Sequence, residues 1–457
     1  MVDLTPALAE LAAAVGNADL ITDPDRMEAY RRDWAKDPSV GMPCAVLRVR
    51  SPEQVVATMQ WATRTRTAVV PRGAGSGLSG GSSAVDGALT LSLDRMTDIE
   101  IDVPTRTARV EPGALNIDVK RAAAEHGLWY PPDPSSQEIC SIGGNLATNA
   151  GGLCCVKYGV TTDYVLGLDV VLADGRFLRL GGRRLKDVAG LSLLKLFVGS
   201  EGTLGVITGA TLRLVPAPPP VSTLVATFPT VGSAADAVVA IGAVLRASMM
   251  ELMDNTAINS VEDMRQMGLD RSAGALLLAQ SDAPGAARHD EIETMARLCR
   301  EHGAGEVFTT DDPEEGEMFT EARRASFLSI EGRGSLLLED VGVPVPLLPA
   351  LLNGIEEIAA RFEVEIPVVA HAGDGNTHPV IIYDAVDADS VSRANAAFAA
   401  VMSLAISLGG TITGEHGVGR LKRFALPEQL GADVMDVSRA IKDALDPLGL
   451  LNPGAVL

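Results

Sequence analysis

The sequence predicts an α+β protein of at least two domains. From about residue 45 to 216, short runs typical of β-strands alternate with glycine clusters and a few helices. The stretch Pro216-Ala-Pro-Pro-Pro-Val221 interrupts this pattern, because proline lacks a backbone donor and biases its predecessor towards extended backbone. Beyond it, longer helical patterns alternate with β-type runs, as in an antiparallel sheet packed against helices. A chain of 457 residues is long enough for two or three cores.

The N-terminal part is expected to hold mostly short strands. Apolar and β-branched residues bounded by turn residues predict strands at 46–49, 68–70, 88–93, 108–110, 168–172 and 204–214. Helical periodicity predicts helices at 52–64 and 117–126. The turn sequence Ala173-Asp-Gly-Arg176 predicts a hairpin that pairs strand 168–172 with a strand at 177–180.

The C-terminal part is expected to hold longer helices. They are predicted at 232–248, 285–302, 314–327, 346–362, 387–408 and 433–445, with strands at 223–227, 275–280, 336–343 and 364–382. We therefore divide the chain into domains at 1–217 and 218–430, followed by a C-terminal helix and tail at 431–457.

Composition and charge exclude several classes of protein. The 59 acidic residues outnumber the 38 Lys and Arg, and a net charge of −21 argues against binding nucleic acid. The short basic clusters at 183–186 and 420–423 are more typical of solvated faces or local anion sites. The N-terminus lacks the features of a signal peptide, and no window approaches about 20 uninterrupted apolar residues. Five cysteines, without a paired metal spacing, fit reduced thiols in a cytoplasmic protein.

Three glycine-rich loops lie within the first predicted domain. They span 71–81, 141–152 and 199–205. Glycine and serine at this density allow backbone N–H groups to converge on an anion such as phosphate. The first loop is neither a Walker A loop nor a clean strand-to-helix Gly-x-Gly-x-x-Gly opening, and alone it would also fit a flexible linker. Three such loops in one domain predict a long ligand that is contacted along much of its length.

Two short segments, 371–378 and 414–417, hold three of the six histidines and a carboxylate. If Asp374 and Gly375 form a two-residue turn, the register places His371 directly opposite His378. Two such imidazoles suit zinc and related divalent ions, and Glu415 would complete three protein ligands. The neighbouring His416 could then move a proton near neutral pH. The alternative is a cross-strand histidine pair bonded to backbone, with Glu415 as a surface acid.

An ordered set of motifs identifies a family resemblance. The chain resembles the FAD-linked D-2-hydroxyacid dehydrogenases, which are flavoproteins similar to vanillyl-alcohol oxidase and include D-lactate dehydrogenases, D-2-hydroxyglutarate dehydrogenases and the flavin subunit of glycolate oxidase. The resemblance covers about residues 45–457, and its motifs lie at 71–81, 131–134, 143–152, 198–208, 371–378, 414–419 and 452–454.

The resemblance implies a two-part FAD-binding domain of the PCMH type and a C-terminal α+β substrate or cap domain with an antiparallel sheet. The last helix and tail would pack back on the FAD domain. FAD would be held non-covalently, because the first glycine loop lacks the histidine that tethers flavin in some relatives. The residues expected to contact FAD are Pro71, Arg72, Gly73, Ala74, Gly75, Ser76, Gly77, Leu78, Ser79, Pro132, Asp133, Ser141, Gly143, Gly144, Asn145, Thr148, Asn149, Gly151, Gly152, Glu201, Gly205, Val206, Ile207 and Asn452.

The resemblance also implies roles for the polar residues of the second domain. His371, His378 and Glu415 would hold a divalent metal, with zinc the first choice and manganese the second. His416 would take the hydroxyl proton of the substrate, and Asn376 would contact the substrate. Arg323, in preference to Arg324, would bind the substrate carboxylate, because a guanidinium binds a carboxylate bidentately. The alternative is that both arginines solvate a helix face.

One position bears on substrate size. Relatives acting on D-2-hydroxyglutarate carry a lysine two positions before the aspartate that matches Asp340, and this chain has Leu338 there. An apolar residue cannot offset the burial of a second carboxylate. We therefore favour a monocarboxylic substrate such as D-lactate, with D-2-hydroxyglutarate and glycolate as alternatives.

Other functions would also account for parts of the sequence. Rival functions are a redox-neutral enzyme similar to alkyl-glycerone-phosphate synthase, a non-catalytic flavin subunit, and a zinc hydrolase, which would leave the glycine loops without a ligand. The electron acceptor could be a quinone, a cytochrome, an electron-transfer flavoprotein or oxygen. We expect no nucleic-acid partner, no transmembrane segment and a cytoplasmic or peripheral membrane location, and a homodimer would be compatible with such a chain.

Overall fold

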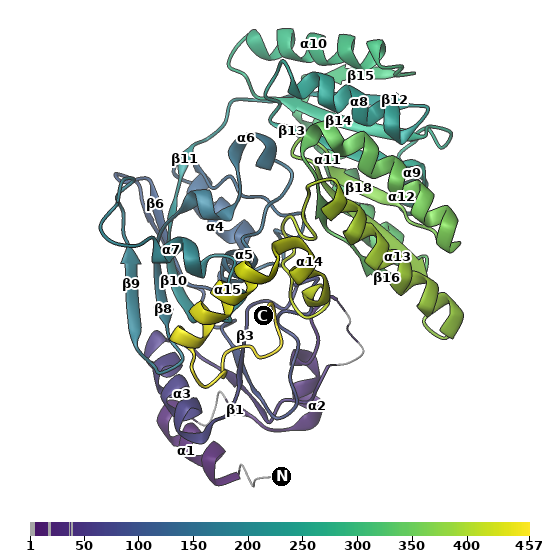
Figure 1. Ribbon diagram of the computed structural model, residues 1–457. Helices are drawn as coiled ribbons and strands as arrows, with labels where there is room; N and C mark the ends of the chain where they lie inside the picture. Colours follow the sequence, from purple (N-terminus) through teal and green to yellow (C-terminus); the bar gives the residue numbers. More distant parts are fainter. Residues whose placement is uncertain (1–4, 17–19, 36, 38–39) are drawn as a thin grey trace. The chain divides into compact units, whose positions relative to one another are not determined.

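The computed structural model describes residues 5–16, 20–35, 37 and 40–457 (Figure 1). The chain forms two compact units: Met1–Gly151, Val160–Ala217 and Glu415–Leu457 make the first, and Gly152–Gly159 with Pro218–Gly414 make the second. The chain passes from the first unit to the second after Ala217, which is also the predicted boundary. It passes back to the first unit at Glu415, before the predicted boundary at 430. The domain limits 1–217, 218–430 and 431–457 stay sequence-based predictions.

The first unit contains two main sheets. Strands β2, β4 and β3 run parallel, because helix α3 (Pro52–Thr65) forms the crossover from β2 to β3. The second sheet, in the order β5-β6-β10-β8-β9, is antiparallel, and the predicted hairpin is confirmed as β8 paired with β9. The strands are β1 (Leu20–Ile21), β2 (Ala45–Arg48), β3 (Val69–Arg72), β4 (Leu89–Ser92), β5 (Ile99–Asp102), β6 (Thr107–Val110), β8 (Val165–Val171), β9 (Phe177–Gly181) and β10 (Val206–Arg213), with a separate pair β7 (Leu128–Trp129) and β11 (Val215–Pro216).

The helices of the first unit are mostly short. They are α1 (Thr5–Val15), α2 (Pro24–Met27), α4 (Asn116–Ala124), α5 (Ile142–Thr148), α7 (Leu193–Phe197), α14 (Leu426–Leu430) and α15 (Ala432–Leu445), with 3-10 turns at Glu28–Tyr30, Thr161–Tyr164 and Arg423–Ala425. Helix α5 forms inside the second glycine loop, where the sequence predicted no helix. Ser141 caps it, because its Oγ accepts a hydrogen bond from the N–H of Gly144 at 3.3 Å.

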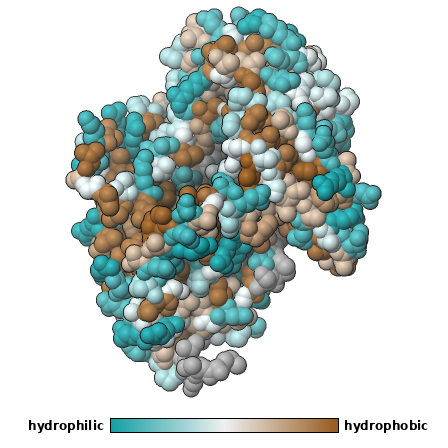
Figure 2. Space-filling model, in the orientation of Figure 1, coloured by the Kyte–Doolittle hydropathy of each residue, from teal (hydrophilic) through white to brown (hydrophobic). Residues whose placement is uncertain are grey.

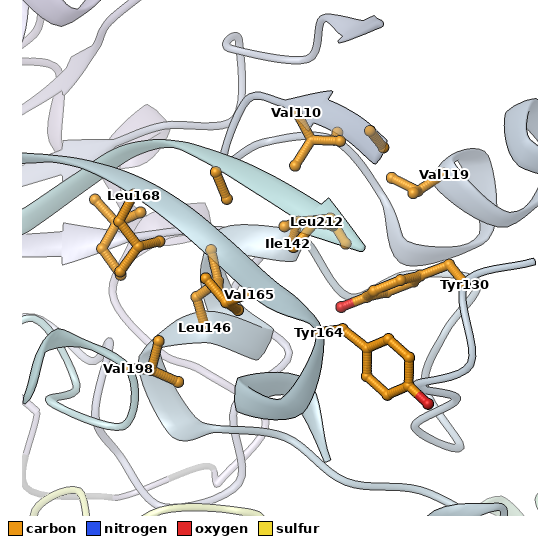
Figure 3. Close-up of a cluster of buried hydrophobic side chains, with 14 of the residues drawn as sticks. Val110, Val119, Tyr130, Ile142, Leu146, Tyr164, Val165, Leu168, Val198 and Leu212 are labelled. Atoms are coloured by element: carbon orange, nitrogen blue, oxygen red, sulfur yellow. The ribbon is translucent and has the colours of Figure 1, made fainter. Parts of the chain in front are cut away.

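A buried apolar cluster fixes α5 in the first unit. Figure 3 shows Leu146 near Val165 and Val198, and Ile142, one helical turn before Leu146, near Leu212 in the same cluster. Since Val198 directly precedes the third glycine loop, the same cluster supports both the second and the third loop. Removal of such side chains from water supplies the main free energy that orders these loops.

The C-terminal segment belongs to the first unit. Ile441 and Leu445 of α15 pack against the cluster that holds α5. The tail then runs parallel to β3: the Val69 N–H donates to Leu450 O, and the Asn452 N–H donates to Val69 O, both at 2.8 Å. In Figure 1 the yellow helix α15 accordingly crosses the first unit near α5 and α7.

The second unit is built on an eight-stranded antiparallel sheet in the order β15-β12-β14-β13-β18-β19-β16, with β17 also paired to β19. The strands are β12 (Ser222–Phe228), β13 (Met249–Asp254), β14 (Ala275–Ser281), β15 (Val307–Thr310), β16 (Ser335–Leu338), β17 (Val341–Gly342), β18 (Val368–His371) and β19 (Asn376–Tyr383). The helices are α6 (Cys155–Tyr158), α8 (Val231–Gly242), α9 (Asn255–Arg265), α10 (Ala287–Glu301), α11 (Pro313–Glu331), α12 (Leu348–Phe362) and α13 (Ala388–Ser407), with a 3-10 turn at Val345–Leu347.

One face of this sheet packs against α9 and α11. Met253, Val369 and Val380, from three strands, share a buried cluster with Ile258 of α9 and Ala322 of α11. Val369 pairs with His378 in the register of β18 and β19, so His378 lies on this same face. The sheet register and α11 together therefore determine the surroundings of the histidine pair.

The basic cluster at 183–186 lies in an exposed loop between β9 and α7. Arg183 contacts Glu100 and Asp102, and Arg184 contacts Asp187, so local ion pairs neutralise part of the cluster. The loop also exposes apolar side chains, with Val188 97% and Leu191 88% exposed, and Figure 2 shows hydrophobic side chains over α7 and β9. Among the described residues, no helix is both long and apolar enough to cross a bilayer.

Candidate functional site

Close approach of backbones joins the first and second glycine loops. The Ser141 Oγ accepts hydrogen bonds from the N–H groups of Ala74 (3.2 Å) and Gly144 (3.3 Å). A Cβ on Gly73 would lie 2.4 Å from the same Oγ and would displace it from these bonds. Glycine at position 73 therefore leaves room for the Ser141 hydroxyl that joins the two loops.

The third glycine loop is bonded to α5 and to the tail. The N–H groups of Gly199 and Glu201 donate to the carbonyls of Leu146 and Ala147, both at 2.9 Å. The Asn452 amide donates to Gly81 O (2.8 Å) and Glu201 O (2.7 Å), and thereby links the tail to the first and third loops. Hydrogen bonds thus join the three loops and Asn452 within the first unit, whereas Gly152, at the end of the second loop, belongs to the second unit.

Six predicted cofactor residues have further contacts beside these loops or lie next to residues that do. The buried Asn116 amide donates to Pro132 O (3.3 Å) and Asn145 Oδ1 (3.0 Å), which holds the segment with Asp133 beside the second loop. Gly205 packs closely on β8, and Val206 and Ile207 follow it in β10. The guanidinium of Arg72 donates hydrogen bonds to the carbonyl oxygens of Arg32 and Ser82. These contacts order the loops, and the assignment of these residues to FAD stays a prediction.

The loop that follows His416 is held by Glu201. The buried carboxylate of Glu201 accepts hydrogen bonds from the N–H groups of Val418 (2.7 Å) and Gly419 (2.9 Å). Burial raises the pKa of Glu201 to about 7. The Glu201 side chain therefore positions the loop that follows His416. The sequence predicted Glu201 as a contact of FAD and did not predict this role.

Ser79 holds the other side of the same loop. Its Oγ donates to His416 O (3.0 Å), and its own carbonyl accepts from the Arg420 N–H (2.9 Å). These bonds use only the backbone of His416. The imidazole, in a side chain that is 14% exposed, lies with Nε2 3.7 Å from Glu415 Oε1.

The predicted register of the histidine hairpin is wrong. β18 and β19 pair Val369 with His378 and His371 with Asn376, so the loop between them has four residues, 372–375, and not two. Both histidines nevertheless lie on the same face, because the register differs from the predicted one by an even number of residues. Their rings meet edge to face with centroids 5.0 Å apart.

Each histidine lies beside a fully buried carboxylate. His371 Nδ1 is 2.8 Å from Glu251 Oε1, and His378 Nδ1 is 3.5 Å from Asp340 Oδ1. Metal-binding histidines commonly bond a carboxylate through the second ring nitrogen, which orients the ring. One ring nitrogen of each histidine lies within 4.8 Å of the other, so the pair suits a divalent metal. Sequence reasoning missed Glu251, for which the sequence carries no local signal.

The third predicted ligand, Glu415, lies where the chain re-enters the first unit. It directly follows Gly414, whose N–H donates to Asp340 Oδ2 at 2.9 Å. The metal set of His371, His378 and Glu415 stays a prediction.

Arg323 and Asn376 extend the site in the second unit. Arg323, on α11, is 4% exposed; its Nε lies 2.9 Å from Glu251 Oε2. The Arg323 Nη2 and the Asn376 Oδ1 are buried without a hydrogen-bond partner in the described part of the chain. Such groups are costly to bury, so a polar ligand at this position would stabilise them. The alternative that Arg323 solvates a helix face is wrong, because its side chain is buried.

Asp254 ties together the elements that carry this site. It caps α9 through a bond from the Ala257 N–H and also accepts from the Val368 N–H, both at 2.8 Å. Burial raises its pKa to about 7. The folded state therefore binds the Asp254 proton more tightly than the unfolded state does. The resulting contribution to the free energy of unfolding is fully present below about pH 4 and is lost as the pH rises through 7.

The Asp254→Asn variant is therefore expected to have a flatter dependence of unfolding free energy on pH. One pKa unit corresponds to about 1.4 kcal/mol, so the wild-type protein should lose a few kcal/mol more than the variant between pH 4 and 8. Urea unfolding across this pH range measures the effect. The control is Asp263→Asn, which changes an exposed aspartate that forms an ion pair with Arg271. Equal slopes for wild type and Asp254→Asn would contradict the prediction.

Comparisons with known proteins agree with this architecture. The sequence profile described as FAD linked oxidases, C-terminal domain, matches residues 217–456, and that of an FAD binding domain matches residues 43–181. The glycolate oxidase subunit GlcD of Bacillus subtilis (strain 168) is 41% identical over 416 residues, which cover 90% of this chain and 88% of that protein. The D-lactate dehydrogenase of Archaeoglobus fulgidus is 34% identical over 441 residues, which cover 94% and 96%.

A solved structure supports the fold. The crystal structure of p-cresol methylhydroxylase with substrate bound aligns with a TM-score of 0.82 over 99% of this chain and 96% of that chain, at 16% identity. The predicted family resemblance and two-part PCMH-type fold are thereby confirmed. This chain belongs to the FAD-linked oxidoreductase family that includes the glycolate oxidase subunit GlcD and D-lactate dehydrogenase.

Proposed function

We propose that this chain oxidises a D-2-hydroxy acid to the 2-oxo acid, with D-lactate or a similar monocarboxylic acid as substrate. One observation carries the proposal: two histidines on one sheet face, each beside a buried carboxylate, occur in a chain whose first unit joins three glycine loops. The names of the relatives, a D-lactate dehydrogenase and a glycolate oxidase subunit, support the same chemistry.

The residues of this chain would bind, orient and deprotonate the substrate. His371, His378 and Glu415 would hold a divalent metal, zinc before manganese, which would act as a Lewis acid. The residues of the glycine loops would hold FAD non-covalently, and FAD would supply the acceptor for the hydride that leaves Cα of the substrate. Arg323 would bind the carboxylate, Asn376 would contact the substrate, and His416 would take the hydroxyl proton at a ring nitrogen. The electron acceptor that follows could be a quinone, a cytochrome, an electron-transfer flavoprotein or oxygen.

Leu338 favours a substrate with one carboxylate. It lies opposite Val380 in the pairing of β16 with β19, and Val380 is two residues from His378. Leu338 is therefore on the histidine face, where it packs with the apolar cluster of the second unit. Glycolate is the second candidate substrate, because the Bacillus subtilis relative is named a glycolate oxidase subunit.

The visible absorption spectrum of the purified protein, recorded without oxygen, tests the proposal. We expect a yellow flavin band that D-lactate bleaches and L-lactate leaves unchanged, with little bleaching by D-2-hydroxyglutarate. Bleaching by glycolate alone would favour the second candidate. A yellow protein that no hydroxy acid reduces would contradict the proposed reaction, and a colourless protein unable to take up FAD would contradict the cofactor.

A further inference from the structure

Glu251 is a fully buried carboxylate in β13 that touches two residues of the proposed site. Its side chain is 0% exposed. Oε1 lies 2.8 Å from His371 Nδ1, and Oε2 lies 2.9 Å from Arg323 Nε. A single carboxylate thus joins a proposed metal ligand to the proposed substrate arginine.

Sheet register brings these groups together. β13 and β18 pair Leu252 with Ala370, and the next step of the same antiparallel register places Glu251 opposite His371. Side chains of directly opposed residues lie on one face with Cβ atoms about 5 Å apart. Arg323 reaches that face from α11, whose neighbouring residue Ala322 packs in the cluster on the same face.

The charges of the three groups balance. A buried carboxylate is stable only when it is paired and hydrogen-bonded, and the Arg323 guanidinium, which is always protonated, supplies the opposite charge. His371 then needs no positive charge, so as a neutral imidazole it donates its Nδ1 hydrogen to Glu251. In this tautomer the lone pair lies on Nε2, which can bind a metal.

We propose that Glu251 is a positioning residue that couples the metal site to the substrate-carboxylate site. It selects the His371 tautomer that presents Nε2 to the metal, and it orients the Arg323 guanidinium. This inference rests on the proposed function, since it takes His371 as a metal ligand and Arg323 as the group that binds substrate.

A glutamine at this position would keep the shape and remove the charge. Its amide N–H₂ would face either Arg323 Nε or His371 Nδ1, and both arrangements disturb the site. In the first, two donors oppose each other. In the second, the amide donates to His371 Nδ1, which places the ring hydrogen on Nε2 and blocks metal binding.

The test is the affinity of chelator-treated protein for Zn²⁺, measured by competition with a chromophoric chelator in the absence of substrate. In Glu251→Gln we expect the dissociation constant for Zn²⁺ to rise about 10- to 100-fold. With zinc saturating, the KM for D-lactate should rise about tenfold as Arg323 loses its orientation. A merely structural role would lower the Tm of the variant without changing the Zn²⁺ affinity of the folded protein.

A matched control and a conservative variant sharpen the test. Glu262→Gln makes the same change at another buried glutamate of the second unit, whose carboxylate accepts hydrogen bonds from the N–H groups of residues 267–269, and it should leave Zn²⁺ affinity unchanged. Glu251→Asp keeps the charge on a shorter side chain and should give an intermediate affinity. If Glu251→Gln does not fold, the Zn²⁺ affinity of Glu251→Asp tests the proposal in its place.

Wild-type Zn²⁺ affinity in the folded Glu251→Gln or Glu251→Asp protein would overturn the coupling, as would wild-type protein that binds no Zn²⁺. A wild-type protein that binds Zn²⁺, with weaker binding in Glu251→Gln, yet reduces its flavin with none of the hydroxy acids would contradict the proposed reaction and leave the role of Glu251 towards His371 standing. The two failures are therefore distinguishable.

Discussion

The His416→Asn variant is expected to reduce its flavin with D-lactate about 10²- to 10⁴-fold more slowly than the wild-type protein, which is the usual contribution of a general base. The variant should still bind FAD. Ser79 holds the His416 loop through the backbone carbonyl, and Glu201 holds it through the N–H groups of Val418 and Gly419. The imidazole can therefore be removed without releasing the loop.

Stopped-flow absorbance of the flavin, without oxygen, measures this rate. His126→Asn, at an exposed position of the same unit, is the matched control and should keep the wild-type rate. Imidazole added to the buffer should restore part of the rate of the His416 variant, since it can replace the missing base. An unchanged rate in His416→Asn would remove His416 from the proposed mechanism.

The His378→Ala variant is expected to lose bound metal and to reduce its flavin about a thousandfold more slowly. A Lewis acid contributes several kcal/mol to the stabilisation of developing charge, and each 1.4 kcal/mol corresponds to about tenfold in rate. The variant also takes a partner away from the buried carboxylate of Asp340, so its Tm should fall.

Metal analysis after dialysis and anaerobic flavin reduction measure the two effects together. Chelator-treated wild-type protein should recover its rate when Zn²⁺ or Mn²⁺ is added, whereas His378→Ala should not recover. Full activity in metal-free His378→Ala protein would contradict a metal at the histidine pair and would leave the pair as a structural contact.

The histidine hairpin shows what a local turn pattern predicts correctly and what it does not. Asp374-Gly375 is a strong turn signal, yet the strands pair with a four-residue loop, and Gly375 with φ 82° is its last residue. Side chains alternate between the two faces of a strand, so an even shift of register preserved the face on which His371 and His378 lie. The metal-site prediction depends on the face and not on the exact pair, so the corrected register leaves it a prediction.

The strand that carries Glu251 was not predicted. Met249-Met-Glu-Leu-Met-Asp254 lacks β-branched residues, and methionine, leucine and glutamate have high helix propensity. In the structure this segment is a strand with neighbours on both sides, β14 and β18. Pairing with the neighbouring strands thus outweighed the local helix propensity. Because the strand was not predicted, the buried position of Glu251 was not predicted either.

Local patterns predicted the glycine loops, most of the longer helices and the residue types that suit a metal and a base. These features depend on turn chemistry, periodicity and side-chain chemistry, all of which are local. The folded chain was needed to show that Ser141 joins two loops, that Glu201 holds the loop of His416, and that Glu251 lies between His371 and Arg323. Such contacts depend on sheet register and helix packing between distant segments, which no local pattern specifies.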